Sequence, residues 1–268
     1  MPRPPRPETA PPPAGMTRYA ALVAYDGAAF HGFAANPGVE TVAGAIDDAL
    51  SRVLSVPVRT ACAGRTDAGV HAWGQVVSFD GPPIEDPGRL EHSLNRMLAP
   101  SIVVRDLSAV TDDFDARFSA ESRTYRYRLL NREQGDPFHH HLVWHVAGPL
   151  DLEAMRTAAS HLVGEHDFSS FCRRRMVLVD GVEVAADLTR EIHAIGIEGV
   201  QGDLVDLWLT ANAFCHQMVR AITGTLVEVG SGKRDAASIP ATIAARDRHA
   251  AGALAPPQGL TLWAVDYG

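Results

Sequence analysis

The chain has 268 residues, of which 46% are hydrophobic and 21% are charged. This length accommodates one large domain or two smaller ones, and the composition excludes a collagen-like repeat and a wholly disordered chain. The 24 Lys and Arg residues against 32 Asp and Glu give a net charge of −8, which argues against a generic basic nucleic-acid coat protein. It does not exclude a nucleic-acid enzyme, because binding depends on where the charges lie.

The prolines predict a disordered tail, and the cysteines indicate the redox state of the compartment. Residues 1–15 contain seven prolines and no apolar run, so we predict a disordered Pro-rich tail and not a signal peptide. The three cysteines, Cys62, Cys172 and Cys215, lie far apart and form no CxxC pair. This pattern favours reduced thiols in the cytoplasm. No run of 18 apolar residues occurs, so we expect no membrane span.

The first half of the chain predicts alternating strands and helices. Apolar residues recur with helical spacing over residues 42–54, and Thr41 is a candidate N-cap. In chain order, we predict a strand at 19–25, a helix at 42–54, strands at 57–63 and 75–79, a helix at 89–98 and a strand at 102–107. The order β-α-β-β-α-β is that of the split βαβ, or ferredoxin-like, fold.

The second half predicts much the same order. It contains expected strands at 124–130, 192–197, 204–209 and 260–265, with helices at 152–163 and 214–229. Glycines at 199 and 202 predict a hairpin between the middle two strands. We therefore expect an α+β protein with two ferredoxin-like halves, 16–111 and 112–268, and a functional cleft between two mainly antiparallel sheets.

The densest polar cluster is the loop at residues 64–71, which reads GRTDAGVH. One interpretation is a local turn, in which Asp67 bonds nearby backbone amides and Arg65 pairs with it at the surface. The other is a carboxylate nucleophile that a guanidinium keeps ionised, with glycines that admit a large substrate.

A second cluster is basic and aromatic. Residues 116–132 hold five Arg and one Glu, a local charge of +4, and Tyr125 and Tyr127 alternate with Arg126 and Arg128. On a strand, the tyrosines and arginines occupy opposite faces. Such faces fit looped RNA, through phosphate pairing and base stacking, but also an ordinary amphipathic strand with tyrosines in the core. Residues 173–175 (RRR) form a second basic spot or a solvated loop.

Two further groups of polar residues are candidates for chemistry. Helical spacing over 214–229 places His216, Arg220 and Thr223 together on the side away from the apolar stripe, facing either solvent or a cleft. The histidines at 139–141 and 145 have no acidic partner at ligand spacing, so we predict no metal site. Phosphate-binding glycine motifs do not occur, so we predict no nucleotide cofactor.

Together these residues closely resemble the TruA family of tRNA pseudouridine synthases. The matching motifs extend through most of the chain: YDG at 25–27, GRTDAGVHA at 64–72, QVV at 75–77, FDARFSA at 114–120, RTYRYR at 123–128, DFSSF at 167–171, the run 211–230, and 259–267.

The resemblance implies the pseudouridine synthase fold and an enzyme that isomerises uridine to pseudouridine. Its targets would be positions thirty-eight, thirty-nine and forty in the anticodon stem-loop of tRNA. It also implies no cofactor, no metal and a cytoplasmic homodimer. Asp67 resembles the catalytic nucleophile, and Arg65 the guanidinium that pairs with it. Tyr125 resembles the tyrosine that stacks on the flipped base, and Arg220 the arginine that reaches the active-site Asp.

Two segments depart from the family pattern, and two alternative functions stay open. Residues 34–37 read AANP where the family often has a WQRQ-like run, and residues 172–188 match no pattern that we recognise. The first alternative is a non-catalytic RNA-binding protein or tRNA chaperone of the same fold, which has no need of the Asp67 carboxylate. The second is a glycosidase, which requires a second carboxylate that the loop does not supply.

Overall fold

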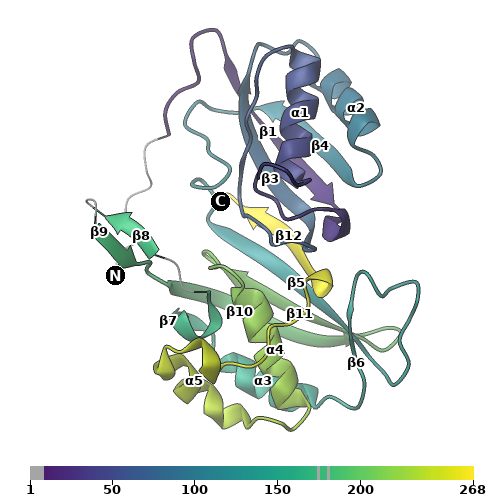
Figure 1. Ribbon diagram of the computed structural model, residues 1–268, viewed down its shortest axis with the longest axis vertical. Helices are drawn as coiled ribbons and strands as arrows, with labels where there is room; N and C mark the ends of the chain where they lie inside the picture. Colours follow the sequence, from purple (N-terminus) through teal and green to yellow (C-terminus); the bar gives the residue numbers. More distant parts are fainter. Residues whose placement is uncertain (1–8, 174–175, 180–181) are drawn as a thin grey trace. The chain divides into compact units, whose positions relative to one another are not determined.

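The computed structural model describes residues 9–173, 176–179 and 182–268, which form two compact units (Figure 1). The first unit extends to Glu121 and includes Thr261–Gly268, and the second is Ser122–Leu260. Of the tail predicted at 1–15, residues 1–8 lie outside the described residues, as do two of the three arginines at 173–175. No helix in the described part of the chain is both long enough and apolar enough to cross a membrane.

The first unit has the predicted β-α-β-β-α-β order. Its elements are β1 (Thr17–Tyr25), α1 (Val42–Leu54), β2 (Ala61–Cys62), β3 (His71–Gly81), α2 (Pro87–Leu98) and β4 (Ile102–Ala109), with β12 (Leu260–Asp266) from the end of the chain. Strand β1 pairs antiparallel with β3 and β4, and β2 pairs antiparallel with β3. Strand β12 pairs in parallel with β3.

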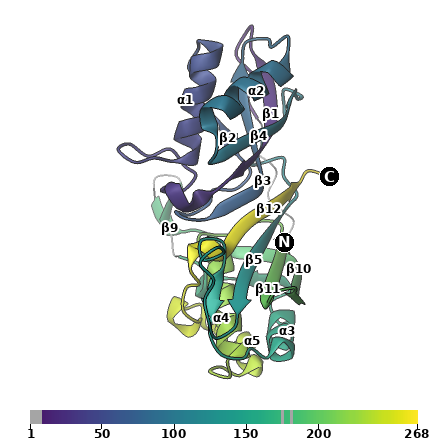
Figure 2. The same ribbon diagram turned by 90° about the vertical axis from the view of Figure 1, so that its right-hand side faces the viewer.

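Amphipathic patterning explains how this unit packs. Alternate residues of β1, from Tyr19 to Tyr25, are buried, and Ile46 and Leu50 of α1 are also buried. Figure 2 shows α1 and α2 together on one face of this sheet. Helix α1 begins where the sequence predicts, because the Thr41 hydroxyl accepts a hydrogen bond of 3.2 Å from the Gly44 N–H.

A buried arginine ties the end of this sheet to the segment that follows β4. The Arg18 guanidinium forms a bidentate pair with Asp80, at 2.8 and 3.0 Å. It also donates to the carbonyls of Ala10, Asp112 and Phe114. The bond to Asp80 raises the pKa of Arg18 above its ordinary value. One side chain thus anchors the start of the 114–120 motif.

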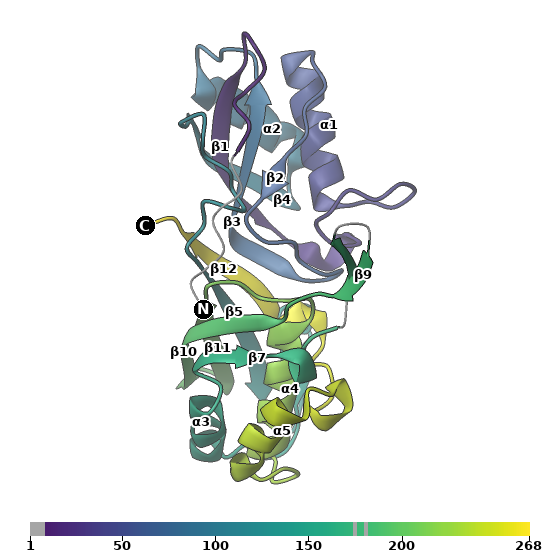
Figure 3. The ribbon, with the colours of Figure 1, turned by 90° about the vertical axis from the view of Figure 1, so that its left-hand side faces the viewer.

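The second unit is built on antiparallel strands in the order β5-β11-β10-β7. Its elements are β5 (Ser122–Asn131), β6 (Trp144–Val146), α3 (Leu152–Ser160), β7 (Gly164–Asp167), β8 (Met176–Val179), β9 (Val182–Ala185), β10 (Thr189–Val200), β11 (Leu204–Ala211), α4 (Met218–Gly230) and α5 (Ile239–Ala245). Strand β6 pairs in parallel with β5, and β8 and β9 form a small ribbon of their own. Figure 3 shows α3, α4 and α5 gathered beside this unit's strands. The predicted α+β class with mainly antiparallel pairing is confirmed.

Short 3-10 helices complete the fold: Gly27–Ala29, Ser169–Phe171, Ala236–Ser238, Arg248–Ala250 and Pro257–Gly259. Segments β6 to β9 and α5 were not predicted. The unmatched residues 172–188 contribute β8 and β9. The predicted strand at 57–63 is only Ala61–Cys62, and helix α4 begins at Met218 because Gln217 has a left-handed φ of 68°.

The division between units differs from the predicted one at 111/112. The last strand belongs to the first unit, because Thr261 and Leu262 of β12 pair with His71 and Ala72 of β3. Glu121 N–H donates to Asp266 O at 2.8 Å, and the Tyr267 hydroxyl donates to Ala116 O at 2.8 Å. These bonds keep the 112–121 segment with the first unit.

The expectation of three reduced thiols is wrong for two of them. Cys172 and Cys215 form a disulfide, although 43 residues separate them, and Cys62 is free. The fold brings the two cysteines together, since Arg173 N–H donates to His216 O at 3.0 Å in the same place. Cysteine spacing carried no sign of this contact, because it forms only in the folded chain.

A thiol titration tests the disulfide. The unfolded, unreduced protein should show one reactive thiol, and the reduced protein three. Burial raises the pKa of Cys62 to about 11, so at pH 8 little thiolate is present. We therefore expect native Cys62 to alkylate at least about tenfold more slowly than the unfolded chain. Three thiols without reductant would contradict the disulfide.

Candidate functional site

The predicted polar loop connects β2 to β3 in the first unit. Arg65 is exposed on it and Asp67 is half-buried. The loop turns back at its tip, where Val70 N–H donates to Asp67 O at 3.1 Å. Gly69 takes a φ of +76°, a left-handed conformation that favours glycine, so the turn fixes the backbone immediately after Asp67.

Two glycines allow other segments to lie directly against this loop. A Cβ on Gly27 would lie 2.0 Å from the Val70 carbonyl oxygen, which no side chain can do. Gly32 has a φ of +96°, and its Cβ would lie 3.0 Å from Thr66 O. The next residue, Phe33, donates its N–H to that same oxygen at 3.1 Å. The YDG motif and the 30–33 segment therefore form the wall behind the loop.

The last residue of the loop is a buried histidine. His71 is 4% exposed, and its Nδ1 accepts a hydrogen bond of 3.1 Å from Gly27 N–H. Asp26 Oδ1 lies 3.1 Å from the same nitrogen. This contact joins the end of the loop to the YDG motif, so His71 acts in packing the loop rather than facing solvent.

Tyr125 lies on β5 of the second unit and is nearly buried. It is 7% exposed, and its ring meets the ring of Phe214 edge-on, with centroids 5.1 Å apart and planes at 85°. Phe214 lies in the segment before α4. The motif at 123–128 and the run 211–230 therefore meet at this aromatic pair.

Arg220 lies in the first turn of α4 and is half-buried. Its Nε donates to Ala255 O at 2.7 Å, and Ala255 N–H donates to Arg220 O at 3.2 Å. The prediction that one helix carries His216, Arg220 and Thr223 on a side open to solvent or a cleft is wrong for two of the three. His216 precedes the helix, and Thr223 is fully buried and donates to Val219 O at 2.9 Å.

The alternation on β5 is confirmed, but its arginines already have partners in the second unit. Tyr125 and Tyr127 are buried on one face. On the other face, Arg128 forms a bidentate pair with buried Asp206, both bonds at 2.6 Å, which raises the pKa of Arg128. The Arg126 guanidinium lies 5.9 Å from the Trp208 ring centroid. These contacts favour the structural interpretation of this face over a phosphate-binding one.

The four predicted site residues thus fall in two units. Arg65 and Asp67 share one loop of the first unit, while Tyr125 and Arg220 belong to the second. The roles implied for them stay predictions. Two of the histidines at 139–141 have local contacts. His139 Nδ1 lies 3.2 Å from Asp136 Oδ2, and His140 Nδ1 lies 2.7 Å from Pro137 O. Among the described residues, no group of three or more His, Cys, Asp or Glu side chains could hold a metal ion.

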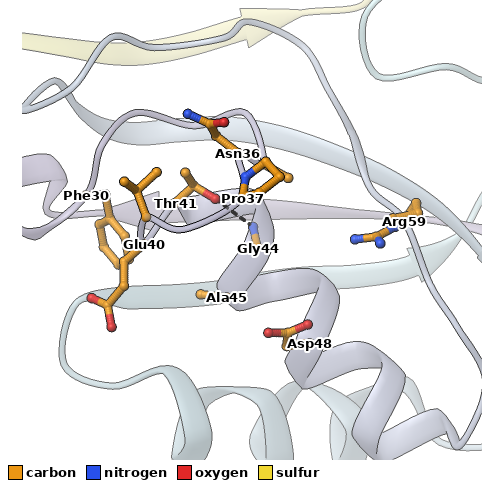
Figure 4. Close-up of a pocket in the computed structure, with 11 residues that line it drawn as sticks. Phe30, Asn36, Pro37, Glu40, Thr41, Gly44, Ala45, Asp48 and Arg59 are labelled. Atoms are coloured by element: carbon orange, nitrogen blue, oxygen red, sulfur yellow. Dashed lines mark hydrogen bonds between the residues drawn. The ribbon is translucent and has the colours of Figure 1, made fainter.

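A pocket of about 640 Å³ lies beside the first turns of α1 (Figure 4). Its walls include residues 35–37, where the sequence departs from the family pattern, and the N-cap Thr41. Glu40 and Asp48 place two carboxylates around it against the single guanidinium of Arg59. This balance disfavours an RNA phosphate. Arg65 and Asp67 are not among the residues described as lining it.

Comparisons with known proteins agree with these motifs. A family model described as tRNA pseudouridine synthase matches residues 21–119 and 158–268. The chain is 43% identical over 254 residues to tRNA pseudouridine synthase A of Brevibacillus brevis, covering 94% of this chain and 100% of that protein. It is 40% identical over 256 residues to the protein of the same name from Myxococcus xanthus, covering 94% and 92%. It is also 43% identical over 245 residues to the protein of that name from Xanthomonas euvesicatoria, and the match covers 91% of this chain and 92% of that protein.

Replacing Arg128 separates structure from RNA binding on β5. Arg128→Met leaves the Asp206 carboxylate buried and unpaired. We expect a loss of about 2–4 kcal/mol in the free energy of unfolding, reduced somewhat because the Arg128 side chain is 27% exposed. Chemical denaturation measures it. The double variant Arg128→Met/Asp206→Leu should recover most of the stability, because it removes both charges.

The same variants test the alternative. Affinity for a tRNA transcript should be unchanged in the folded double variant. A tenfold weaker affinity with intact stability would show that Arg128 contacts phosphate.

Proposed function

The chain belongs to the tRNA pseudouridine synthase family, and from that premise we propose where in tRNA it acts and which residues carry out the reaction. As a member of that family it is an isomerase that converts uridine to pseudouridine in tRNA. We propose that its targets are positions thirty-eight, thirty-nine and forty of the anticodon stem-loop. The resemblance of the ordered motifs to the TruA family supports this choice of target.

Asp67 is the proposed nucleophile. The observation that carries this role is the built loop around it: a glycine turn fixes the backbone after Asp67, and Gly27 and Phe33 support the loop from behind. A carboxylate that must attack one atom of a large substrate needs such a fixed backbone. To Arg65, which is exposed and lies two residues before it, we assign the pairing with that carboxylate and a contact that helps to hold the target uridine out of the stack.

The isomerisation itself needs only bond exchange at one nucleotide. The bond between the sugar C1′ and base N1 breaks, the uracil turns, and a bond forms between C1′ and C5. The C5 proton is lost and N1 gains a proton, so atoms and electrons balance without any redox partner. Asp67 can add to the sugar C1′, which tethers the sugar, or to the base C6, which tethers the base, and the site retains the other fragment while the base turns. The bond to Asp67 then breaks, either as C1′ bonds to C5 or by elimination from C6 afterwards, and the carboxylate is regenerated.

Tyr125 and Arg220 complete the proposed machinery. The base must leave the helical stack, which costs a few kcal/mol, and contact with an aromatic ring returns about 1–3 kcal/mol. We assign that contact to Tyr125, whose ring Phe214 orients. We assign to Arg220 a contact with the Asp67 carboxylate when tRNA is bound, with its Nε–Ala255 bond orienting the guanidinium.

We further propose that the enzyme works in the cytoplasm as a homodimer that holds one tRNA, without a metal or cofactor. The competing proposal, a tRNA chaperone of the same fold, predicts binding without any chemical change in the RNA. The presence of the intact RTD sequence at 65–67 favours the enzyme, since binding alone does not require a carboxylate there.

Asp67→Asn tests the nucleophile. The substrate is an unmodified tRNA with uridine at positions thirty-eight to forty, and the assay detects carbodiimide-stable pseudouridine. The wild type should modify these uridines, whereas Asp67→Asn should lose activity by at least about four orders of magnitude, because the amide is not a nucleophile. No product from the wild type would overturn the proposed targets, and equal product from both would overturn the role of Asp67.

Tyr125→Phe and Tyr125→Ala separate ring contact from hydroxyl chemistry. Phe keeps the edge-on packing against Phe214, so tRNA affinity should stay near that of the wild type. Ala should weaken binding by about 1–3 kcal/mol, or roughly five- to 150-fold in Kd, if the ring contacts the flipped base. Equal affinities for the two variants would contradict this role. Thermal melts must first show that both variants fold.

A further inference from the structure

The loop that carries Asp67 has an internal alternation. Thr66 is buried, at only 8% exposed, and the half-buried Gly64 bonds to the buried Gln75 side chain, whereas Arg65 is exposed and Asp67 is half-buried. The backbone on either side of Arg65 is therefore fixed from inside the unit. What fixes it determines where Arg65 and Asp67 are presented.

The Gln75 side chain fixes the backbone at Gly64. Ala63 N–H donates to Val76 O at 2.9 Å, as in a regular strand pair. At the next position in register, the Gln75 side chain replaces the strand backbone. Its Oε1 accepts from Gly64 N–H at 3.2 Å, and its Nε2 donates to Gly64 O at 2.6 Å. Gln75 is fully buried, so this amide extends the strand pairing by one residue as the chain leaves the sheet.

The Tyr25 hydroxyl fixes the loop at Thr66. Its hydroxyl lies 2.8 Å from Thr66 Oγ1 in a buried hydrogen bond, and Tyr25 is only 4% exposed. Gln75 Nε2 lies 3.5 Å from the same hydroxyl, so the two holding points are adjacent. Tyr25 is on β1 and Gln75 on β3, and these strands are paired in the sheet. The loop is thus fastened to two neighbouring strands.

Burial makes this arrangement rigid. A buried polar group that loses its partner costs about 1–3 kcal/mol, so each alternative position of Gly64 or Thr66 carries that penalty. The loop backbone then has one favoured position. A nucleophile displaced by about 1 Å can lose about 100-fold in rate, so fixing the backbone is a direct contribution to catalysis.

We infer that Tyr25 and Gln75 are positioning residues for Asp67, which hold Thr66 and Gly64 so that the Asp67 carboxylate is presented to the target uridine. The inference rests on the proposed function. Neither side chain is assigned a contact with substrate. Gln75 acts through the Gly64 backbone and Tyr25 through the Thr66 side chain, and they therefore control turnover more than tRNA binding.

The test uses matched tyrosine variants on one strand. Tyr25→Phe removes only the hydroxyl that meets Thr66. Tyr19→Phe is the control, because Tyr19 is also on β1, is 2% exposed, and its hydroxyl accepts a hydrogen bond from Ile84 N–H at 2.8 Å, away from the loop. Thr66→Val removes the partner hydroxyl, and Thr66→Ser keeps it.

Tyr25→Phe and Thr66→Val should each lower kcat for pseudouridine formation by about 10- to 100-fold, with KM for tRNA within about twofold. Thr66→Ser should restore kcat to within about threefold of the wild type, and the Tyr25→Phe/Thr66→Val double variant should be no slower than the slower single variant. Gln75→Met should reduce kcat at least as much, provided that a thermal melt shows that it folds. Equal kcat values for Tyr25→Phe and Tyr19→Phe would overturn the inference.

Amide hydrogen exchange gives a readout that does not depend on activity. Exchange of residues 64–68 should accelerate in Tyr25→Phe and Thr66→Val, and stay at the wild-type rate in Tyr19→Phe. Unchanged exchange in all variants would overturn the positioning role. If the wild type makes no pseudouridine while the exchange pattern holds, the proposed target has failed and the fastening of the loop stands.

Discussion

A single side-chain amide bonds both polar groups of Gly64, and the geometry of the loop depends on that contact. Gln75 continues the β2–β3 pairing for one residue after the strands diverge. From that point the direction of the chain is set, and the Tyr25 hydroxyl fixes it again at Thr66. Gly27 is then needed because the fixed loop leaves no room for a Cβ there, and Gly32 because its φ of +96° favours glycine and its Cβ would lie close to the loop. The motifs YDG and GRTDAGVH are parts of one packed unit, although about 40 residues separate them in the sequence.

The same alternation of inward and outward side chains organises β5. Tyr127 faces the core, where its hydroxyl donates to Pro256 O at 2.7 Å and burial raises its pKa. Arg128 faces the other way, but Asp206 binds it, so its charge is used within the unit. A count of arginines between 116 and 132 therefore overstates the charge offered to RNA. Arg65, by contrast, is exposed.

Helix positions that depend on capping and apolar spacing could be predicted from the sequence. The Thr41 cap and the apolar spacing of α1 place that helix correctly, because capping and burial act within a few residues. The start of α4 could not be predicted, since it depends on the left-handed backbone of Gln217, which the apolar spacing does not reveal. The Cys172–Cys215 bond and the place of β12 beside β3 escaped prediction because both join segments that are distant in sequence.

Some residues of the candidate site could be predicted from local sequence, and others could not. Asp67 stands out within its motif, whereas Tyr25 and Gln75 appear in the YDG and QVV motifs with no role that the sequence assigns to them. A glutamine within the apolar run at 72–79 was the available signal of a buried polar contact. Its partner could not be inferred, because the Gly64 peptide reaches Gln75 only once β2 and β3 have paired.

We propose that a fixed loop presents Asp67 to a uridine taken out of the anticodon stem-loop. The most direct test is the crystal structure of the inactive Asp67→Asn variant bound to tRNA with uridine at position thirty-nine. We predict that this uridine is unstacked, with its C1′ or C6 in van der Waals contact with the side chain at position 67, and that the backbone of 64–67 is unchanged from the free protein. A uridine still stacked in its helix, or bound instead in the pocket beside α1, would contradict this role of the loop.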